Sequence, residues 1–139
     1  MNKLYDIPKI GIAVDGGCLN NPGYAEYRGI DLCTGKVVFH TKIGYATNNI
    51  AEFLAVCQAL IYTQTIGVKT IIYTDSRTAI SWFKNKRHNS AFKRQLNEQA
   101  FELMDECVKW LHNNKKTNFV VWWDKWKFGE IPADFGRKK

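Results

Sequence analysis

Uncharged apolar residues open the chain and then give way to two alternating segments. The run from Ile10 to Val14 holds no charged side chain and leads directly into Asp15 and two glycines. Such a run of small and β-branched residues is typical of a strand covered on both faces. Residues 24–32 and 37–43 alternate apolar with polar positions, and turn formers at 34–36 separate them. The pattern predicts an antiparallel meander of three strands, the first ending at Asp15.

A helix and a further strand follow this meander. Residues 50–61 are helix formers without proline or glycine and include a single acid, Glu52, which predicts a buried helix. Residues 69–74 repeat the pattern of the first predicted strand, because a short β-branched run is again followed by an aspartate, Asp75. A strand, a helix and a second strand imply a right-handed crossover, so this strand is expected to pair in parallel with a neighbour.

The second half of the chain predicts two more helices and a last strand. Residues 78–83 fit a short helix, and apolar positions from Phe92 to Leu111 recur in steps of three and four, as in a long amphipathic helix. Residues 118–123 form the last predicted strand. A loop rich in aromatics and lysine is expected at 124–129, and one helical turn at 131–137. Strands and helices in this order predict an α/β domain.

Composition narrows the class of protein. With 139 residues and 45% apolar content, the chain fits one globular domain, residues 1–139, with a hydrophobic core. It has no apolar run that would cross a bilayer, and residues 1–9 lack a secretory signal, so we expect a cytoplasmic protein without a membrane partner. Its four widely spaced cysteines form no Cys-x-x-Cys pair, which favours reduced, mostly buried thiols over a zinc site or a disulfide framework.

The chain is basic, yet four acids stand where predicted elements begin or end. Lysine and arginine number 20 against 13 acids, a formal net charge of +7, which favours a polyanionic partner such as nucleic acid without establishing one. Asp15 and Asp75 follow strands. Glu52 has no basic residue three or four positions away, and Asp134 lies in the final turn. Local alternatives exist: Asp15 starts a turn, Glu52 closes a capping box with Asn49, and Asp75 caps the next helix.

Gathering these four acids would require cations. Adjacent parallel strands would bring Asp15 and Asp75 out at the same edge of the sheet, where the helix start and the C-terminal turn can face them. So many carboxylates together would have strongly raised pKa values unless divalent cations lay among them. Carboxylate oxygens select Mg²⁺ or Mn²⁺ rather than zinc. Two such ions about 4 Å apart can hold a scissile phosphate, activate a water and stabilise the leaving oxygen.

Four motifs, in this order, resemble those of the type 1 ribonuclease H family over nearly the whole chain. They are Asp15-Gly16-Gly17-Cys18-Leu19-Asn20-Asn21-Pro22-Gly23, Thr47-Asn48-Asn49-x-x-Glu52, Tyr73-Thr74-Asp75-Ser76 and Pro132-Ala133-Asp134. The resemblance implies a ribonuclease H-like five-stranded mixed sheet, three antiparallel strands followed by parallel ones, flanked by helices. It also implies endonucleolytic hydrolysis of the RNA strand of an RNA–DNA hybrid with two Mg²⁺ ions, for which Mn²⁺ can substitute. The products would carry 5′-phosphate and 3′-hydroxyl ends.

By this resemblance the four acids are the catalytic metal ligands. Asp15 would bridge the two ions, and Asp134 would hold the ion that activates water. Glu52 and Asp75 would complete the shells. The residues expected to bind substrate are Gly16, Cys18, Asn21, Thr47, Asn48, Ser76, Arg77, Trp82, Lys84, Lys86 and Arg87.

These substrate residues fall into groups by the strand they would contact. The set expected to read RNA 2′-hydroxyls is Gly16, Asn21, Asn48, Ser76 and Arg77. Thr47 together with Asn21 would grip a phosphate of the DNA strand. Trp82 and the basic residues that follow it would lie along the DNA strand, where charge makes binding salt-dependent. An ordinary solvated charge run is the alternative for residues 84–87.

The chain departs from the family pattern in two places. Members often carry a histidine in the loop before the last aspartate, thought to help product leave, whereas residues 124–130 hold none. Lys125, Lys127 and Glu130 are the candidates for that role. Arg77 stands where an amide side chain is frequent, which alters its hydrogen bonding. We expect a monomer. The rival functions are a hybrid-binding module without chemistry and a DNA nuclease of the resolvase or integrase kind.

Overall fold

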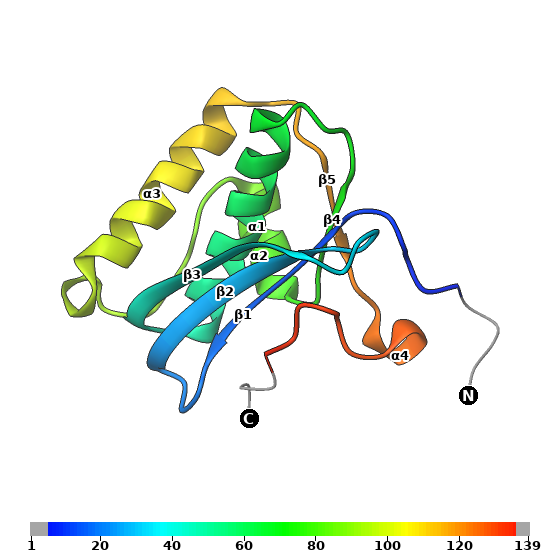
Figure 1. Cartoon of the computed structure of the whole chain (residues 1–139). Helices are drawn as coiled ribbons and strands as arrows, with labels where there is room; N and C mark the ends of the chain where they lie inside the picture. Colours follow the sequence, from blue (N-terminus) through cyan, green and yellow to red (C-terminus); the bar gives the residue numbers. More distant parts are fainter. Residues whose placement is uncertain (1–5, 136–139) are drawn as a thin grey trace.

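A five-stranded sheet organises the chain (Figure 1). The structure, a computed structural model, describes residues 6–135. Its strands, in the spatial order β3-β2-β1-β4-β5, are β1 (Ile12–Cys18), β2 (Gly23–Asp31), β3 (Val37–Ala46), β4 (Ile71–Thr74) and β5 (Phe119–Trp122). Its helices are α1 (Asn48–Thr65), α2 (Arg77–Asn85), α3 (Glu98–Asn113) and α4 (Lys125–Phe128), with a 3₁₀ turn at Arg94–Leu96.

The two halves of the sheet pair differently. β1, β2 and β3 form an antiparallel meander, whereas β4 pairs in parallel with β1, and β5 pairs in parallel with β4. β1 is the central strand, and all of its residues are buried. The predicted fold class is therefore confirmed: an α/β domain with three antiparallel strands followed by parallel ones.

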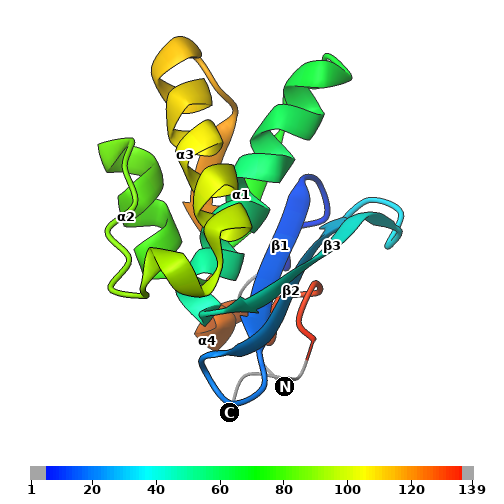
Figure 2. The ribbon, with the colours of Figure 1, turned by 90° about the vertical axis from the view of Figure 1, so that its left-hand side faces the viewer.

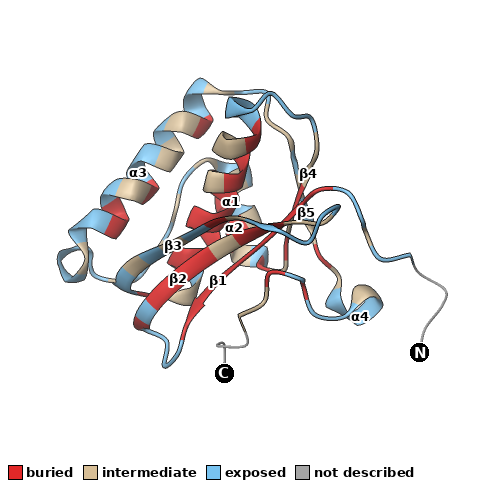
Figure 3. Ribbon diagram, in the orientation of Figure 1, coloured by how far each residue is buried: buried red, intermediate tan, exposed pale blue. Residues whose placement is uncertain are grey.

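The sheet separates two cores of unequal size. Helices α1, α2 and α3 cover one face, and the C-terminal segment crosses the other (Figure 2). The main core lies under α1, which is buried along most of its length (Figure 3). The smaller core on the opposite face consists of Ala13, Ile30, Trp123, Ile131 and Ala133. Alternate residues of β1 supply the two cores, since successive side chains of a strand point to opposite faces.

The opening strand is longer than the sequence predicts. β1 continues through Gly16 and Gly17 to Cys18, so Asp15 lies inside the strand and not at its end. Gly16 is required by the approach of α1, because a Cβ there would lie 2.6 Å from the carbonyl carbon of Ala51. Gly16, which together with Gly17 reads as a turn signal, therefore allows close packing of a helix on a strand.

The long helix begins later than its apolar periodicity predicts. α3 begins at Glu98, and Asn97 caps it by accepting a hydrogen bond from the N–H of Ala100 at 3.0 Å. The Asn97 amide also donates to two carbonyl oxygens of β3. Leu96, one of the periodic apolar positions, is 53% exposed, whereas Phe92 packs against the core from outside any helix. A contact with β3 thus sets the helix start.

The C-terminal part also differs in detail from the prediction. Residues 124–129 contain the short helix α4, which Asp124 caps by accepting a hydrogen bond from the N–H of Trp126 at 3.0 Å. A turn follows, in which the Asp134 N–H donates to the carbonyl oxygen of Ile131 at 2.9 Å. The remainder of the predicted helical turn at 131–137 lies outside the described residues.

The four cysteines are free thiols. Cys18 and Cys57 are buried, and burial raises the pKa of both. Cys107 is half-buried and Cys33 is exposed, so fewer thiols are buried than expected. No helix within residues 6–135 combines the length and the apolar character that crossing a bilayer demands.

Candidate metal centre and nucleic-acid interface

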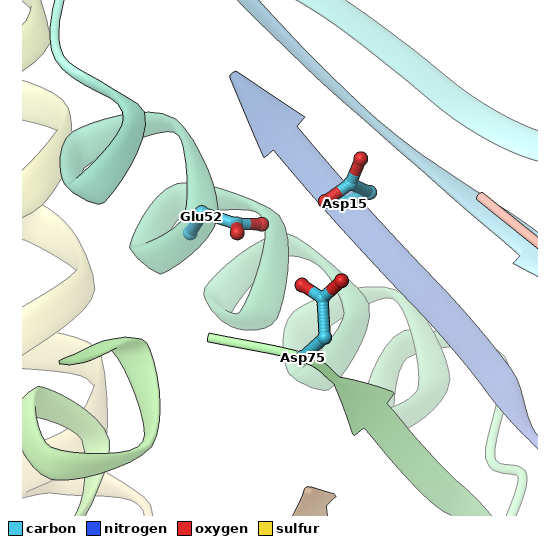
Figure 4. Close-up of side chains that lie close together, drawn as sticks. All are labelled: Asp15, Glu52 and Asp75. Atoms are coloured by element: carbon cyan, nitrogen blue, oxygen red, sulfur yellow. The ribbon is translucent and has the colours of Figure 1, made fainter. Parts of the chain in front are cut away.

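Three carboxylates meet beside the parallel half of the sheet (Figure 4). Asp15 comes from β1, Glu52 from α1, and Asp75 from the first residue after β4. One oxygen of each lies within 4.8 Å of the others. Asp15 is fully buried and Glu52 nearly so, while Asp75 is half-buried. The structure therefore brings three of the four predicted metal ligands into one group.

The topology of the sheet places the two aspartates. β1 and β4 pair in parallel for the last time at Ala13 with Tyr73. Asp15 and Asp75 each stand two residues beyond that pair, where the two strands part. A crevice beside the central strand of an α/β sheet, past the end of its parallel pairing, is a common ligand position. The prediction that both aspartates reach the same edge is correct, although β1 itself continues alongside β2.

Glu52 reaches the aspartates because α1 lies directly on β1. Its Oε1 accepts a hydrogen bond from the N–H of Gly16 at 2.8 Å, which fixes the carboxylate next to Asp15. The capping-box alternative is wrong: the N-cap of α1 is Thr47 and not Asn49, and Glu52 lies beyond the first helical turn. Glu52 of α1 therefore contacts β1 and does not cap the helix.

The local alternatives for the two aspartates are wrong as well. Ser76 caps α2, because its Oγ accepts a hydrogen bond from the N–H of Ala79 at 3.0 Å, so Asp75 has no capping role. Asp15 lies within a strand and not in a turn. The placement of these acids is explained by the group they form.

The donor set fits a hard divalent cation. It consists of carboxylate oxygens alone, which are the ligands that Mg²⁺ and Mn²⁺ prefer, and it offers neither the thiolates nor the imidazoles that favour zinc. Like charges this close repel each other, and a divalent cation among them turns that repulsion into attraction. Asp15, Glu52 and Asp75 could therefore hold Mg²⁺ or Mn²⁺.

Asp134 does not join this group in the structure. Among residues 6–135, the only group of three or more potential ligands whose atoms all lie within 4.8 Å of one another consists of the other three acids. The main chain of Asp134 is held from β2, where Arg28 donates hydrogen bonds to the carbonyl oxygens of Ala133 and Asp134, each at 2.8 Å. Arg28 stands opposite Asp15 in the register of β1 and β2. The sequence pattern did not point to Arg28, whose partners lie more than a hundred residues away along the chain.

The predicted substrate residues at the start of α1 are tied together by hydrogen bonds. Asn48 Oδ1 accepts a bond from the Cys18 N–H at 2.9 Å, and Asn21 Oδ1 accepts one from the Asn48 N–H at 3.0 Å. The Cys18 thiol also lies 3.3 Å from Asn48 Oδ1. Thr47 Oγ1 accepts a bond from the N–H of Ile50 at 3.2 Å. The end of β1, the following loop and the start of α1 thus form one connected patch.

Comparison with known proteins identifies the family. The family model described as RNase H matches residues 8–123, a span that includes Asp15, Glu52 and Asp75 and ends before Asp134. The chain belongs to the ribonuclease H family.

Two relatives support this assignment over most of the chain. The Ribonuclease H of Neorickettsia sennetsu is 30% identical over 129 residues, which cover 79% of this chain and 85% of that protein. The Ribonuclease H of Wigglesworthia glossinidia brevipalpis is 32% identical over 133 residues, which cover 91% of this chain and 82% of that protein.

Solved structures share the fold at lower identity. LC11-RNase H1, isolated from compost by a metagenomic approach, is 22% identical with a TM-score of 0.57, over 86% of each chain. RNase H1 from the halophilic archaeon Halobacterium salinarum NRC-1 is 18% identical with a TM-score of 0.56, over 91% of this chain and 93% of that one. This likeness concerns the fold alone.

Helix α2 of this ribonuclease H carries the next predicted substrate residues. Arg77 is exposed, and its guanidinium carbon lies 4.0 Å from the ring centroid of Trp122, a cation–π contact that holds the side chain against β5. Trp82 is only 7% exposed and packs edge to face on Phe53 at 5.5 Å. Trp82 is therefore mainly a core residue, and only a small part of its surface can face a ligand.

The basic residues after Trp82 are divided by the end of α2. Lys84 and Arg87 are exposed, whereas Lys86 is half-buried and ends the helix in the left-handed conformation, with φ of 53°. Arg77 and Lys84 line an open cavity of about 390 Å³ between α2 and β5. Of the predicted basic residues 84–87, Lys84 and Arg87 therefore lie on a solvated, charged surface.

Proposed function

We propose that this ribonuclease H cleaves the RNA strand of RNA–DNA hybrids endonucleolytically, using two Mg²⁺ ions or Mn²⁺ in their place, and leaves 5′-phosphate and 3′-hydroxyl ends. The observation that carries the proposal is the convergence of Asp15, Glu52 and Asp75 within 4.8 Å at the crevice of the sheet. A protein of the same fold, LC11-RNase H1, is known in complex with an RNA/DNA hybrid, at 21% identity and a TM-score of 0.56. That complex supports the same substrate class here.

The proposed roles of the acids are those that the family resemblance implies. Asp15 would be shared by the two ions, Glu52 and Asp75 would complete their shells, and Asp134 would hold the ion that activates the attacking water. When bound, the ions would polarise the scissile phosphate and lower the pKa of that water. The Gly16 N–H already holds Glu52 in place, so this carboxylate needs no rearrangement before it can act.

The recognition of RNA is assigned to the patch at the start of α1, to Ser76 and to Arg77. Since Gly16 gives its N–H to Glu52, its proposed contact with a 2′-hydroxyl uses the carbonyl oxygen. Asn48 and Asn21 accept main-chain hydrogen bonds through Oδ1, so the amide nitrogens are the groups assigned to the substrate. Contacts with 2′-hydroxyls distinguish RNA from DNA. Cys18 contributes through its position beside Asn48.

The DNA strand is assigned to the surface around α2. Lys84 and Arg87 are its exposed cations, and Arg77, two residues after Asp75 in the chain, lines the same cavity as Lys84. Because Trp82 is buried, we assign the attraction for DNA to the charges, with Trp82 supporting them from beneath. Thr47, whose hydroxyl caps α1, stands at a helix N-terminus, where a DNA phosphate would be favoured. Binding should therefore weaken steeply as salt rises.

The proposal extends to the setting in which the enzyme works. It describes a single domain, residues 1–139, acting as a monomer in the cytoplasm, where four free thiols are compatible with a reducing environment. In the segment 124–130, Lys125, Lys127 and Glu130 are exposed and are the proposed replacements for the histidine that assists product release in the family.

Cleavage of a hybrid with labelled RNA, with Mg²⁺ or with EDTA, tests the proposed function. The protein is expected to cut the RNA only with Mg²⁺, and Asp75→Asn should lose about 100-fold or more of the rate. Equal, metal-independent inactivity of both proteins, with hybrid binding retained, would favour the module without chemistry. Cleavage of duplex DNA of the same sequence at a comparable rate would favour the DNA nuclease.

A further inference from the structure

The segment that carries Asp134 is attached to the sheet through one side chain of β2. Arg28 donates from Nε to the carbonyl oxygen of Ala133 and from a terminal nitrogen to that of Asp134, each at 2.8 Å. Its guanidinium carbon also lies 4.5 Å from the ring centroid of Phe135. A planar guanidinium that makes two hydrogen bonds and one ring contact fixes both the position and the direction of the main chain.

The same side chain stands next to the acidic group. In the β1–β2 register Arg28 is directly opposite Asp15, and opposite residues of an antiparallel pair lie on the same face with Cβ atoms about 5 Å apart. The carbonyl oxygens that Arg28 holds are therefore close to the face of β1 from which Asp15 projects. This explains how a residue far along the chain reaches the neighbourhood of the three carboxylates.

The remaining contacts anchor the segment before and after Asp134. Ile131 and Ala133 are buried in the smaller core, and the Asp134 N–H closes a turn on the carbonyl oxygen of Ile131. On the other side, the ring of Phe135 lies 5.5 Å from that of His40, which is bonded to the buried Glu26 at 2.6 Å. Among these contacts, only those of Arg28 grip the main chain of Asp134 from the strand next to Asp15.

We propose that Arg28 is a positioning residue for catalysis, which holds the main chain of Asp134 beside the three-carboxylate group so that the fourth carboxylate can join when a divalent cation binds. The inference rests on the proposed function. Arg28 acts through Asp134 and touches no reacting atom. The Asp134 carboxylate stands outside the group in this structure, so its approach depends on how closely its main chain is held.

A double-mutant cycle on the full chain tests this role. Arg28→Gln is expected to lower kcat for hybrid cleavage by about 10- to 100-fold with KM nearly unchanged, the range seen when a group that orients a metal ligand is removed. Asp134→Asn should lose activity as well. Because both changes would disable the same carboxylate, the double variant should be no slower than Asp134→Asn alone. Losses that multiply in the double variant would overturn the proposal.

Two further variants separate positioning from charge and from general stability. Arg28→Lys keeps the charge but not the two-pronged geometry, so it should restore kcat only in small part; full restoration would show that charge alone matters and would overturn the proposal. Arg94→Gln is the matched control, since Arg94, like Arg28, makes two hydrogen bonds. Its partners are the carboxylates of Glu98 and Asp105 on helix α3, away from the acidic group. This control variant should leave kcat unchanged.

A metal titration gives a readout that does not depend on cleavage. Mn²⁺ binding is measured calorimetrically with the wild-type protein and Arg28→Gln, each shown to be folded by its melting curve. The variant is expected to bind Mn²⁺ about 10-fold more weakly, or with fewer ions per chain. Identical titrations and identical kcat would overturn the role of Arg28 alone. If wild-type protein binds no Mn²⁺ and cuts no hybrid, the proposed function itself fails.

Discussion

Replacing Asp75 by asparagine should make the metal-free protein more stable while abolishing its response to Mg²⁺. The three ligand oxygens lie within 4.8 Å of one another, and two unit charges at that distance repel by about 3.5 kcal/mol at an effective dielectric constant of about 20, or by about 0.9 kcal/mol in bulk water. Asp75 takes part in two such pairs, so between these two dielectric limits its charge destabilises the metal-free folded state by about 2 to 7 kcal/mol.

The expected net gain is smaller, because Asp75 is half-buried and salt screens part of the repulsion. We expect the free energy of unfolding in EDTA to rise by about 1 to 3 kcal/mol. For a chain of this length that corresponds to a rise in Tm of about 3 to 10 °C. Mg²⁺ at a hundred times its Kd should increase the free energy of unfolding of the wild-type protein by about 2.7 kcal/mol and so raise its Tm, and it should barely affect the variant. Thermal melts followed by circular dichroism, in EDTA and in Mg²⁺, measure both effects.

Asp105→Asn provides a matched control with the opposite sign. The hydrogen bond from His88, followed by that from Arg94, lowers the pKa of Asp105, so its charge is favoured in the folded state. Its folded-state pKa is depressed, and the stability it contributes is present at neutral pH and lost as pH falls below about 4. This variant should be slightly less stable than wild type at pH 7, by under about 1 kcal/mol because the site is exposed, and the difference should vanish in acid. If Asp75→Asn also destabilised the protein in EDTA, the contacts of the Asp75 carboxylate would outweigh its repulsion by the other two acids, and the reasoning would be refuted.

Substitutions at Gly16, Glu52 and Trp126 test how the site is built. Gly16→Ala places a Cβ 2.6 Å from a carbonyl carbon of α1, so we expect a loss of about 1 to 3 kcal/mol in chemical denaturation together with reduced cleavage. Gly29→Ala, whose Cβ would lie 2.6 Å from the ring of Phe39 on the meander, should destabilise the protein without this loss of cleavage. Glu52→Gln removes one charge from the acidic group but keeps an acceptor oxygen for the buried Gly16 N–H, so in EDTA it should melt at or above the wild-type temperature. Glu52→Ala removes the same charge and the acceptor, so it should be about 1 to 3 kcal/mol less stable than Glu52→Gln; both should lose Mg²⁺-dependent cleavage. Trp126, 86% exposed on α4, is expected to contact the nucleic acid, so Trp126→Ala should raise KM for the hybrid about 5-fold or more without changing kcat or Tm, and an unchanged KM would exclude such a contact.

The acids on parallel strands were predictable because their positions follow from topology. A β-branched run that ends in an aspartate occurs twice, and the intervening helix forces parallel pairing, so Asp15 and Asp75 had to come out at one edge. Glu52 was predictable from the lack of a basic neighbour at helical spacing. These signals are local or depend only on the order of elements.

The features that could not be predicted from the sequence depend on contacts between segments that are distant along the chain. The glycine after Asp15 reads as a turn, and only the approach of α1 reveals that it continues a strand. The apolar repeat ran through Leu96, although a hydrogen bond from Asn97 to β3 begins the helix two residues later. Arg28 stood in a predicted strand without any local sign of the carbonyl groups that it holds. In each case a tertiary contact overrode a correct local pattern.

The close packing of α1 on β1 at Gly16 sets the distance between the main chains of Asp15 and Glu52. The N–H of Gly16 then holds the Glu52 carboxylate beside Asp15. Substitutions of the side chains exposed on α2, α3 or α4 therefore leave these two acids where they are. The side chains exposed on those later elements can be exchanged to favour other nucleic acids, so the hydrolytic half of the molecule can be retained as a fixed module while its preference is redesigned.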